Sequence, residues 1–141
     1  MKRILPLALL ALSCPTLSLE AQDDKILELG RLTYQTCVAC HGPDGKGIRA
    51  GDLLMAPSLH ESAFLKGDHP DLLTAIILKG IAKQDNQYVQ AMLPLGAILN
   101  DEQIAALIAY STKEFGGTRR NAKPGDVSKW RKEFAGRTSP W

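Results

Sequence analysis

Three residues near the middle of the chain have types and a spacing that could do chemistry. Cys37, Cys40 and His41 form a C-x-x-C-H pattern, which is the attachment signature of a c-type haem. On a helical turn, residues three and four positions apart share a face. The two thiols could therefore meet the two haem vinyl groups while the imidazole reaches the iron from the same side. The pattern predicts one covalently attached haem, held by Cys37 and Cys40, with His41 as an iron ligand.

Three other uses of the two cysteines find less support in the sequence. A thioredoxin-like redox pair needs a βαβ setting, and the chain has no such pattern. A zinc site needs four ligands, and only His60 and His69 remain as further histidines. A disulfide between Cys37 and Cys40 would close a loop too small to add much stability, and it would leave His41 without a role.

The iron of an electron carrier needs a sixth ligand, and Met/His ligation raises its reduction potential. The candidates are Met55, Met92, His60 and His69, because Met1 lies in a segment that we expect to be removed. Met92 is favoured, since it lies in an irregular stretch beside a proline and a glycine and just before a capped helix. Met55 is expected to line the haem pocket, and the two histidines to be surface or capping residues.

The elements that must position these residues are predicted to be helices. Apolar residues recur at steps of three and four after Asp23 and Asp24, between Pro70 and Gly80, and between Asn100 and Gly116. A fourth helical pattern follows Pro124. Between them lie two stretches rich in glycine and proline, 42–58 and 81–99, and the first has no strand pattern. The chain is therefore expected to be all-α, with long loops that surround a ligand.

The first 21 residues have the layout of a secretory signal. Lys2 and Arg3 precede an apolar run that is too short to span a bilayer, and Ala21 is a plausible cleavage position. Pro6 and Pro15 disfavour the alternative of a buried helix. Lipidation of Cys14 is a second alternative, although the residues before it make a poor lipobox. We expect a periplasmic protein with no membrane-spanning segment in the mature chain.

Composition and charge fit a single small domain. The 141 residues are 45% hydrophobic and carry a formal net charge of +2. Loss of residues 1–21 removes Lys2, Arg3 and Glu20, which leaves 15 basic and 14 acidic residues. Such a balance argues against a nucleic-acid partner, which needs a strongly basic surface. The predicted organisation is a signal peptide (1–21), a haem domain (22–115) and a basic C-terminal extension (116–141).

The chain resembles the class I c-type cytochromes over residues 27–115. The residues that carry the resemblance are Gly30, Tyr34, Cys37 to Gly42, Ala56 to Leu59, Met92, Pro94, Gly96, Asn100 to Ile104 and Tyr110. The resemblance implies a cytochrome c fold of three to four core helices around one haem, plus a helical C-terminal extension. It also implies that Gly30 lies at a helix crossing beside Tyr34 and Tyr110, and that the Pro57 carbonyl accepts a hydrogen bond from Nδ1 of His41. In one departure, Leu93 separates Met92 from Pro94.

The C-terminal residues 136–141, together with the Met-x-Pro-Leu-Gly string, resemble cytochrome modules that accompany quinoprotein and other periplasmic dehydrogenases. We therefore expect an electron carrier rather than an enzyme, with a dehydrogenase, a terminal oxidase or both as redox partners. The expected apolar cage of the haem consists of Leu53, Leu59, Leu72, Ile76, Leu93 and Leu95. The alternative is a five-coordinate haem sensor or peroxidase-like protein that binds a small ligand. The basic extension is expected either to dock an acidic partner or to pack on the domain through Trp130 and Phe134.

Overall fold

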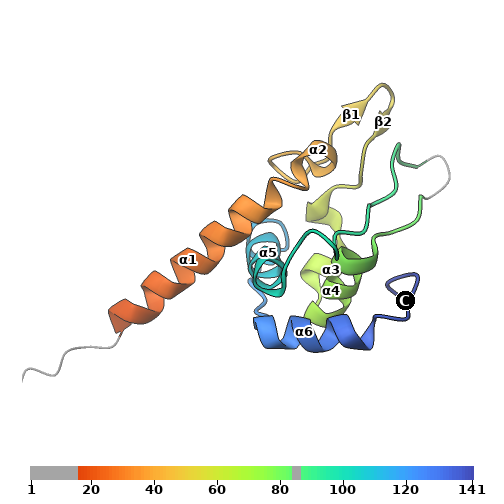
Figure 1. Ribbon diagram of the computed structural model, residues 1–141. Helices are drawn as coiled ribbons and strands as arrows, with labels where there is room; N and C mark the ends of the chain where they lie inside the picture. Colours follow the sequence, from red (N-terminus) through yellow and green to blue (C-terminus); the bar gives the residue numbers. More distant parts are fainter. Residues whose placement is uncertain (1–15, 84–86) are drawn as a thin grey trace, which may run out of the picture.

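The computed structural model describes residues 16–83 and 87–141, and this part of the chain is mostly helical (Figure 1). The all-α prediction is confirmed. The longer helices are α1 (Thr16–Tyr34), α4 (Pro70–Lys79), α5 (Asp101–Glu114) and α6 (Pro124–Glu133). The shorter elements are α2 (Val38–His41), the 3-10 helix η1 (Leu59–Glu61), α3 (Ala63–Lys66), and the strands β1 (Arg49–Ala50) and β2 (Leu53–Leu54).

The central contact of the fold is the crossing of α1 and α5 (Figure 1). Gly30 allows it, because a Cβ atom at this position would lie 2.6 Å from Cβ of Tyr110 and would also meet the carbonyl of Ala106. The rings of Tyr34 and Tyr110 pack beside the crossing with their centroids 5.7 Å apart. The expected crossing at Gly30 is thus confirmed.

The start of α1 differs from the prediction. The helix was expected to begin after Asp23 and Asp24, but it begins at Thr16 and places both aspartates in its interior. The physical reason is that the preceding residues include leucine, glutamate and alanine, which continue a helix, with no glycine or proline to stop it. Residues 1–15, which hold Cys14 and most of the expected signal, lie outside the described part of the chain. Cleavage after Ala21 stays a prediction.

The expectation that the first loop has no strand was wrong in detail. β1 and β2 pair in antiparallel fashion, with Arg49 opposite Leu54 and Ala50 opposite Leu53. Gly51 has a φ of 67°, which permits the tight turn between them. Strands of two residues are too short to show an alternating pattern, so they cannot be predicted from the sequence. Leu54 also forms an isolated parallel bridge with Tyr88, which ties the two loops together.

The C-terminal extension folds back onto the domain. α6 packs against α4 and α5 (Figure 1), and the side chains of Val127 and Phe134 are buried there. Trp130 is partly buried against the same core. Phe134 is therefore packed as expected, and Trp130 only in part. None of the described helices is long and apolar enough to cross a membrane.

Candidate functional site

The C-x-x-C-H residues form a helical turn directly after α1. The amide of Cys37 donates to the carbonyl of Tyr34 at 2.8 Å, and the amide of His41 donates to the carbonyl of Cys37 at 2.9 Å. This confirms the expected turn, in which side chains three and four positions apart share a face. Both cysteines are partly buried free thiols, so neither is committed to a disulfide.

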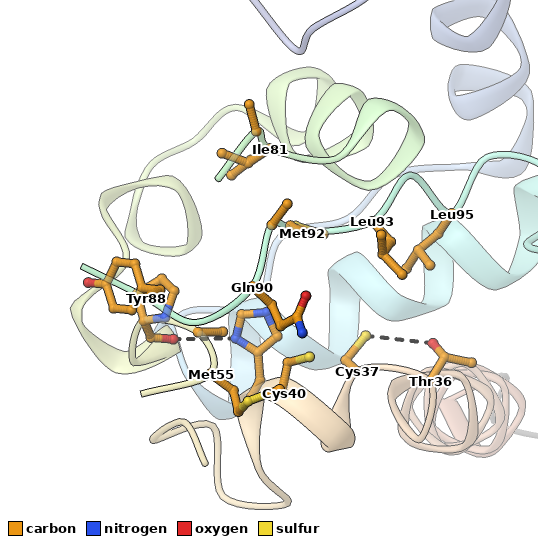
Figure 2. A pocket seen from close by; sticks show the side chains of 15 residues that line it. Thr36, Cys37, Cys40, Met55, Ile81, Tyr88, Gln90, Met92, Leu93 and Leu95 are labelled. Carbon is orange, nitrogen blue, oxygen red and sulfur yellow. Dashed lines mark hydrogen bonds between the residues drawn. The ribbon is translucent and has the colours of Figure 1, made fainter. Parts of the chain in front are cut away.

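The turn forms one wall of a cavity of about 360 Å³. Its size falls in the range of small-molecule and cofactor sites. Figure 2 shows Cys37 and Cys40 on one side of the cavity and Met92 on the opposite side. Four segments supply the lining, which is mainly apolar: Thr36, Cys37, Cys40 and His41; Met55, Ala56 and Pro57; Ile81 and Ala82; and Tyr88, Gln90, Ala91, Met92, Leu93 and Leu95.

The imidazole of His41 is fixed by the loop that contains Pro57. Nδ1 of His41 lies 3.3 Å from the Pro57 carbonyl oxygen. A carbonyl can only accept, so Nδ1 carries the proton and Nε2 keeps its lone pair for a metal. Burial lowers the pKa of His41, and the Pro57 hydrogen bond opposes this to a smaller extent. The structure thus places Pro57 where the resemblance implied, and it favours the neutral form that binds iron.

Met92 is held by its own backbone against the end of α4. Its amide donates to the carbonyl of Ile81, and the amide of Ile81 donates back, both at 3.0 Å. Gly80, at the C-terminal cap of α4, has a φ of 69°. A Cβ atom there would lie 2.8 Å from the backbone nitrogen of Pro94, so only glycine lets the two segments come this close. The backbone of Met92 therefore has a defined position beside the cavity.

Met55 and His69 lie where the sequence suggested, whereas His60 is half-buried rather than a surface or capping residue. Met55 lines the cavity. Nε2 of His60 lies 2.8 Å from the carbonyl oxygen of Asp44, and its ring meets the ring of Phe115 edge-on. His69 occupies the N-cap position of α4 and is exposed. Neither histidine lines the cavity.

The expected apolar cage is only partly confirmed, because Leu93 and Leu95 line the cavity and the other four residues do not. Leu53 is 40% exposed, and Ile76 faces a smaller neighbouring cavity of about 80 Å³ that Met92 also borders. The helical stripe of α4 faces α5 and α6 instead. Sequence reasoning missed the lining residues Thr36, Ile81, Ala82, Tyr88, Gln90 and Ala91. Thr36 and Ala91 lie next to Cys37 and Met92, and the other four carried no signal in the sequence.

Comparison with known families identifies the cofactor of the chain. The sequence model of the family described as cytochrome c matches residues 27–110. The chain belongs to the cytochrome c family. No curated protein sequence matches it. Members of the family bind haem c covalently through cysteine residues and carry electrons. The chain is therefore a haem-based electron carrier. Within the matched residues, Cys37 and Cys40 are the cysteines to which the haem is attached.

The residues of the cavity fit this cofactor. Two free thiols lie on one helical turn, an imidazole nitrogen is available beside them, and the lining is mainly apolar. These are the groups needed for two thioether bonds, one axial ligand and the exclusion of water. The match ends at residue 110, so the extension 116–141 of this cytochrome lies beyond the family's common core.

Proposed function

We propose that this cytochrome is a periplasmic one-electron carrier in which His41 and Met92 are the axial ligands of the haem iron. The observation that carries the proposal is the position of Met92 across the cavity from Cys37 and Cys40 (Figure 2). A bound haem supplies an iron that alternates between the ferrous and ferric states. An imidazole on one side and a thioether on the other favour the reduced state relative to more basic ligand pairs.

The protein's own residues hold both proposed ligands in place beside a mainly apolar lining. The Pro57 hydrogen bond orients the His41 ring, and the Ile81 backbone pairing fixes Met92. Among the described residues that line the cavity there is no Asp, Glu, Lys or Arg. Such a lining lacks the acid–base pair that peroxide chemistry requires, and it suits electron transfer, in which little else has to move.

The test of the axial ligation compares Met92→Ala with Met55→Leu, because both methionines line the cavity. The reduced holoprotein is expected to show the α band of a c-type haem and to bind carbon monoxide only slowly. Met92→Ala should bind carbon monoxide rapidly and have a changed reduction potential, whereas Met55→Leu should behave nearly like the natural protein. A potential that does not change in Met92→Ala would contradict the proposal.

The periplasmic location rests on the signal-like layout of residues 1–21. The intact mass of protein recovered from the periplasm tests it, since the mass reports both the mature N-terminus and the added haem. A mass that starts at residue 22 and includes one haem is the expected result. A mass that retains residues 1–21 would contradict export by cleavage, and a mass that starts at Cys14 with added acyl chains would show lipidation instead.

The proposed electron donor is a periplasmic dehydrogenase with an acidic docking face. The extension holds seven basic and two acidic residues. Arg119 and Arg120 form ion pairs within the domain, whereas Lys129 and Lys132 are exposed on α6. Exposed positive charge would steer an acidic partner. A quinoprotein dehydrogenase with its substrate should reduce the ferric protein at a rate that falls as salt rises, and a salt-independent rate would exclude electrostatic docking.

A five-coordinate haem that binds a small ligand is the second candidate function. The observation in its favour is Gln90, whose side chain projects into the cavity in Figure 2 and could donate a hydrogen bond to a bound diatomic molecule. Rapid carbon monoxide binding by the natural reduced protein, unchanged in Met92→Ala, would support this function and exclude the His41/Met92 pair.

A further inference from the structure

One arginine of the C-terminal extension contacts the segment that follows Met92. Nη1 of Arg131 donates to the Gly96 carbonyl at 2.6 Å, and Nη2 donates to the Leu99 carbonyl at 2.9 Å. Nε lies 2.8 Å from Oδ1 of Asp101, the first residue of α5, with which it forms an ion pair. The side chain of Arg131 is 32% exposed, so the three bonds are partly shielded from water.

These bonds fix the downstream end of the segment that carries Met92. The upstream end is fixed by the Ile81 backbone pairing and by the close approach at Gly80. Between the two ends, the amide of Leu95 donates to Ile77 at 2.9 Å. A guanidinium presents its donors in one rigid plane. The single side chain of Arg131 therefore fixes the positions of two carbonyl groups and of the start of α5 relative to one another.

We propose that Arg131 is a positioning residue for Met92. It does not line the cavity, and it acts through Gly96 and Leu99 to keep the thioether on the iron and to oppose its displacement by other ligands. This inference rests on the proposed His41/Met92 ligation. The extension lies beyond the family match at 27–110. Through Arg131 it would help to determine how tightly Met92 binds the iron.

The chain offers a closely matched control in Arg120. This arginine also belongs to the extension, and its side chain is 23% exposed. It donates to the Gly67 carbonyl at 3.2 Å and to the Lys66 carbonyl at 3.4 Å, and it pairs with Asp68 at 3.2 Å. Its partners lie at the C-terminal end of α3 and in the link to α4, and none of them lines the cavity. Loss of either arginine thus removes two carbonyl contacts and one ion pair, but only Arg131 touches the segment after Met92.

The experiment titrates the ferric holoproteins of the natural chain, Arg131→Gln, Arg120→Gln and Met92→Ala with imidazole and follows the haem absorption. Imidazole replaces the thioether while the iron stays ferric. Arg131→Gln is expected to bind imidazole at least about tenfold more tightly than the natural protein, which corresponds to 1.4 kcal/mol at 25 °C. Arg120→Gln should bind it like the natural protein. Urea unfolding of each variant reports general stability separately.

Hydrogen exchange of the reduced holoproteins provides a readout that does not depend on added ligand. The amides of Leu95 and Leu99 should exchange faster in Arg131→Gln but not in Arg120→Gln, because only the first variant releases this segment. If Arg131→Gln does not fold, Arg131→Lys takes its place, since lysine keeps the charge near Asp101 and loses the planar fork.

Equal gains in imidazole affinity for the Arg131 and Arg120 variants would overturn the inference, because they would reflect general destabilisation. Unchanged affinity in Arg131→Gln would also overturn it. A comparison of the natural protein with Met92→Ala tests separately whether Met92 is a ligand of the iron at all. If the natural protein binds imidazole as tightly as Met92→Ala, then Met92 is not on the iron and the proposed function fails at that point.

Discussion

The carbonyl oxygen of Pro57 lies 3.3 Å from Nδ1 of His41, across a separation of 16 residues in the chain. A hydrogen bond at this nitrogen makes the imidazole a more basic ligand and fixes its orientation. A more basic ligand favours the ferric state, so the Pro57 contact is expected to lower the reduction potential.

Pro57→Ala keeps the carbonyl but removes the ring that restricts the backbone. The hydrogen bond to His41 should weaken, and the reduction potential should rise by up to about 60 mV, which is a tenfold change in equilibrium for one electron. Redox titration of the holoprotein measures the shift. Pro43→Ala is the control, because Pro43 is exposed in the same loop. Equal shifts in both variants would show that loop flexibility, not the bond to His41, is responsible.

Tyr34 is expected to stabilise the fold through one buried hydrogen bond. Its hydroxyl donates to the carbonyl of Gly42 at 2.7 Å, directly after the C-x-x-C-H turn. Tyr34→Phe would leave that carbonyl without its partner, at a cost of about 1–2 kcal/mol in the free energy of unfolding. Urea unfolding near neutral pH measures the difference, and a variant as stable as the natural protein would contradict the expected role.

The same tyrosine should make stability depend on alkaline pH. Burial raises the pKa of Tyr34 above its ordinary value of 10.0. Its contribution to stability is therefore complete below the pKa of the unfolded chain, about 10, and it is lost as the pH rises toward the higher pKa of the folded state. The natural protein should lose stability more steeply than Tyr34→Phe above about pH 10. Parallel curves in this range would show that the folded protein does not hold Tyr34 protonated.

Gly30 is expected to tolerate no side chain. In Gly30→Ala the new methyl group would lie 2.6 Å from Cβ of Tyr110, so α1 and α5 would have to separate. We expect a loss of about 1–3 kcal/mol in the free energy of unfolding. Gly125→Ala, in α6, is the matched control, since a Cβ there meets nothing within 4 Å. This control should be neutral or more stable, because alanine favours a helix over glycine. Similar losses in the two variants would contradict the close crossing.

Phe134 is expected to anchor the C-terminal extension to the domain. Its side chain is 4% exposed, whereas Trp141, the last residue, is 63% exposed. Phe134→Ala should lower the free energy of unfolding by about 3–5 kcal/mol. Trp141→Ala should change it by less than about 1 kcal/mol. Thermal unfolding of the holoproteins compares them, and a stable Phe134→Ala protein would show that the extension is not part of the core.

The sequence predicted the helices that have clear end signals. Pro70 and Gly80 bracket α4 as expected, and Asn100 caps α5 through reciprocal bonds with Gln103. It could not predict β1, β2 or α3, because elements of two to four residues have no period to detect. The start of α1 was missed because no residue between Thr16 and Asp23 interrupts a helix.

The residues of the site also divide into those that the sequence could predict and those that it could not. Cys37, Cys40 and His41 follow from a local pattern, and Pro57 from a family resemblance. Gln90 and Tyr88 were missed as lining residues because an irregular loop has no periodic face from which to infer burial. The contact of Arg131 with Gly96 spans 35 residues and depends on how α6 packs, which no local pattern specifies.

The position of Met92 on the iron can be measured directly by nuclear magnetic resonance of the reduced holoprotein with its methionine methyl groups labelled with carbon-13. A methyl group held over the centre of the haem is strongly shielded by the ring current, whereas a methyl group at its edge is not. We predict one strongly shielded methyl resonance that persists in Met55→Leu and disappears in Met92→Ala. A spectrum with no such resonance, or one in which it disappears only in Met55→Leu, would contradict the account.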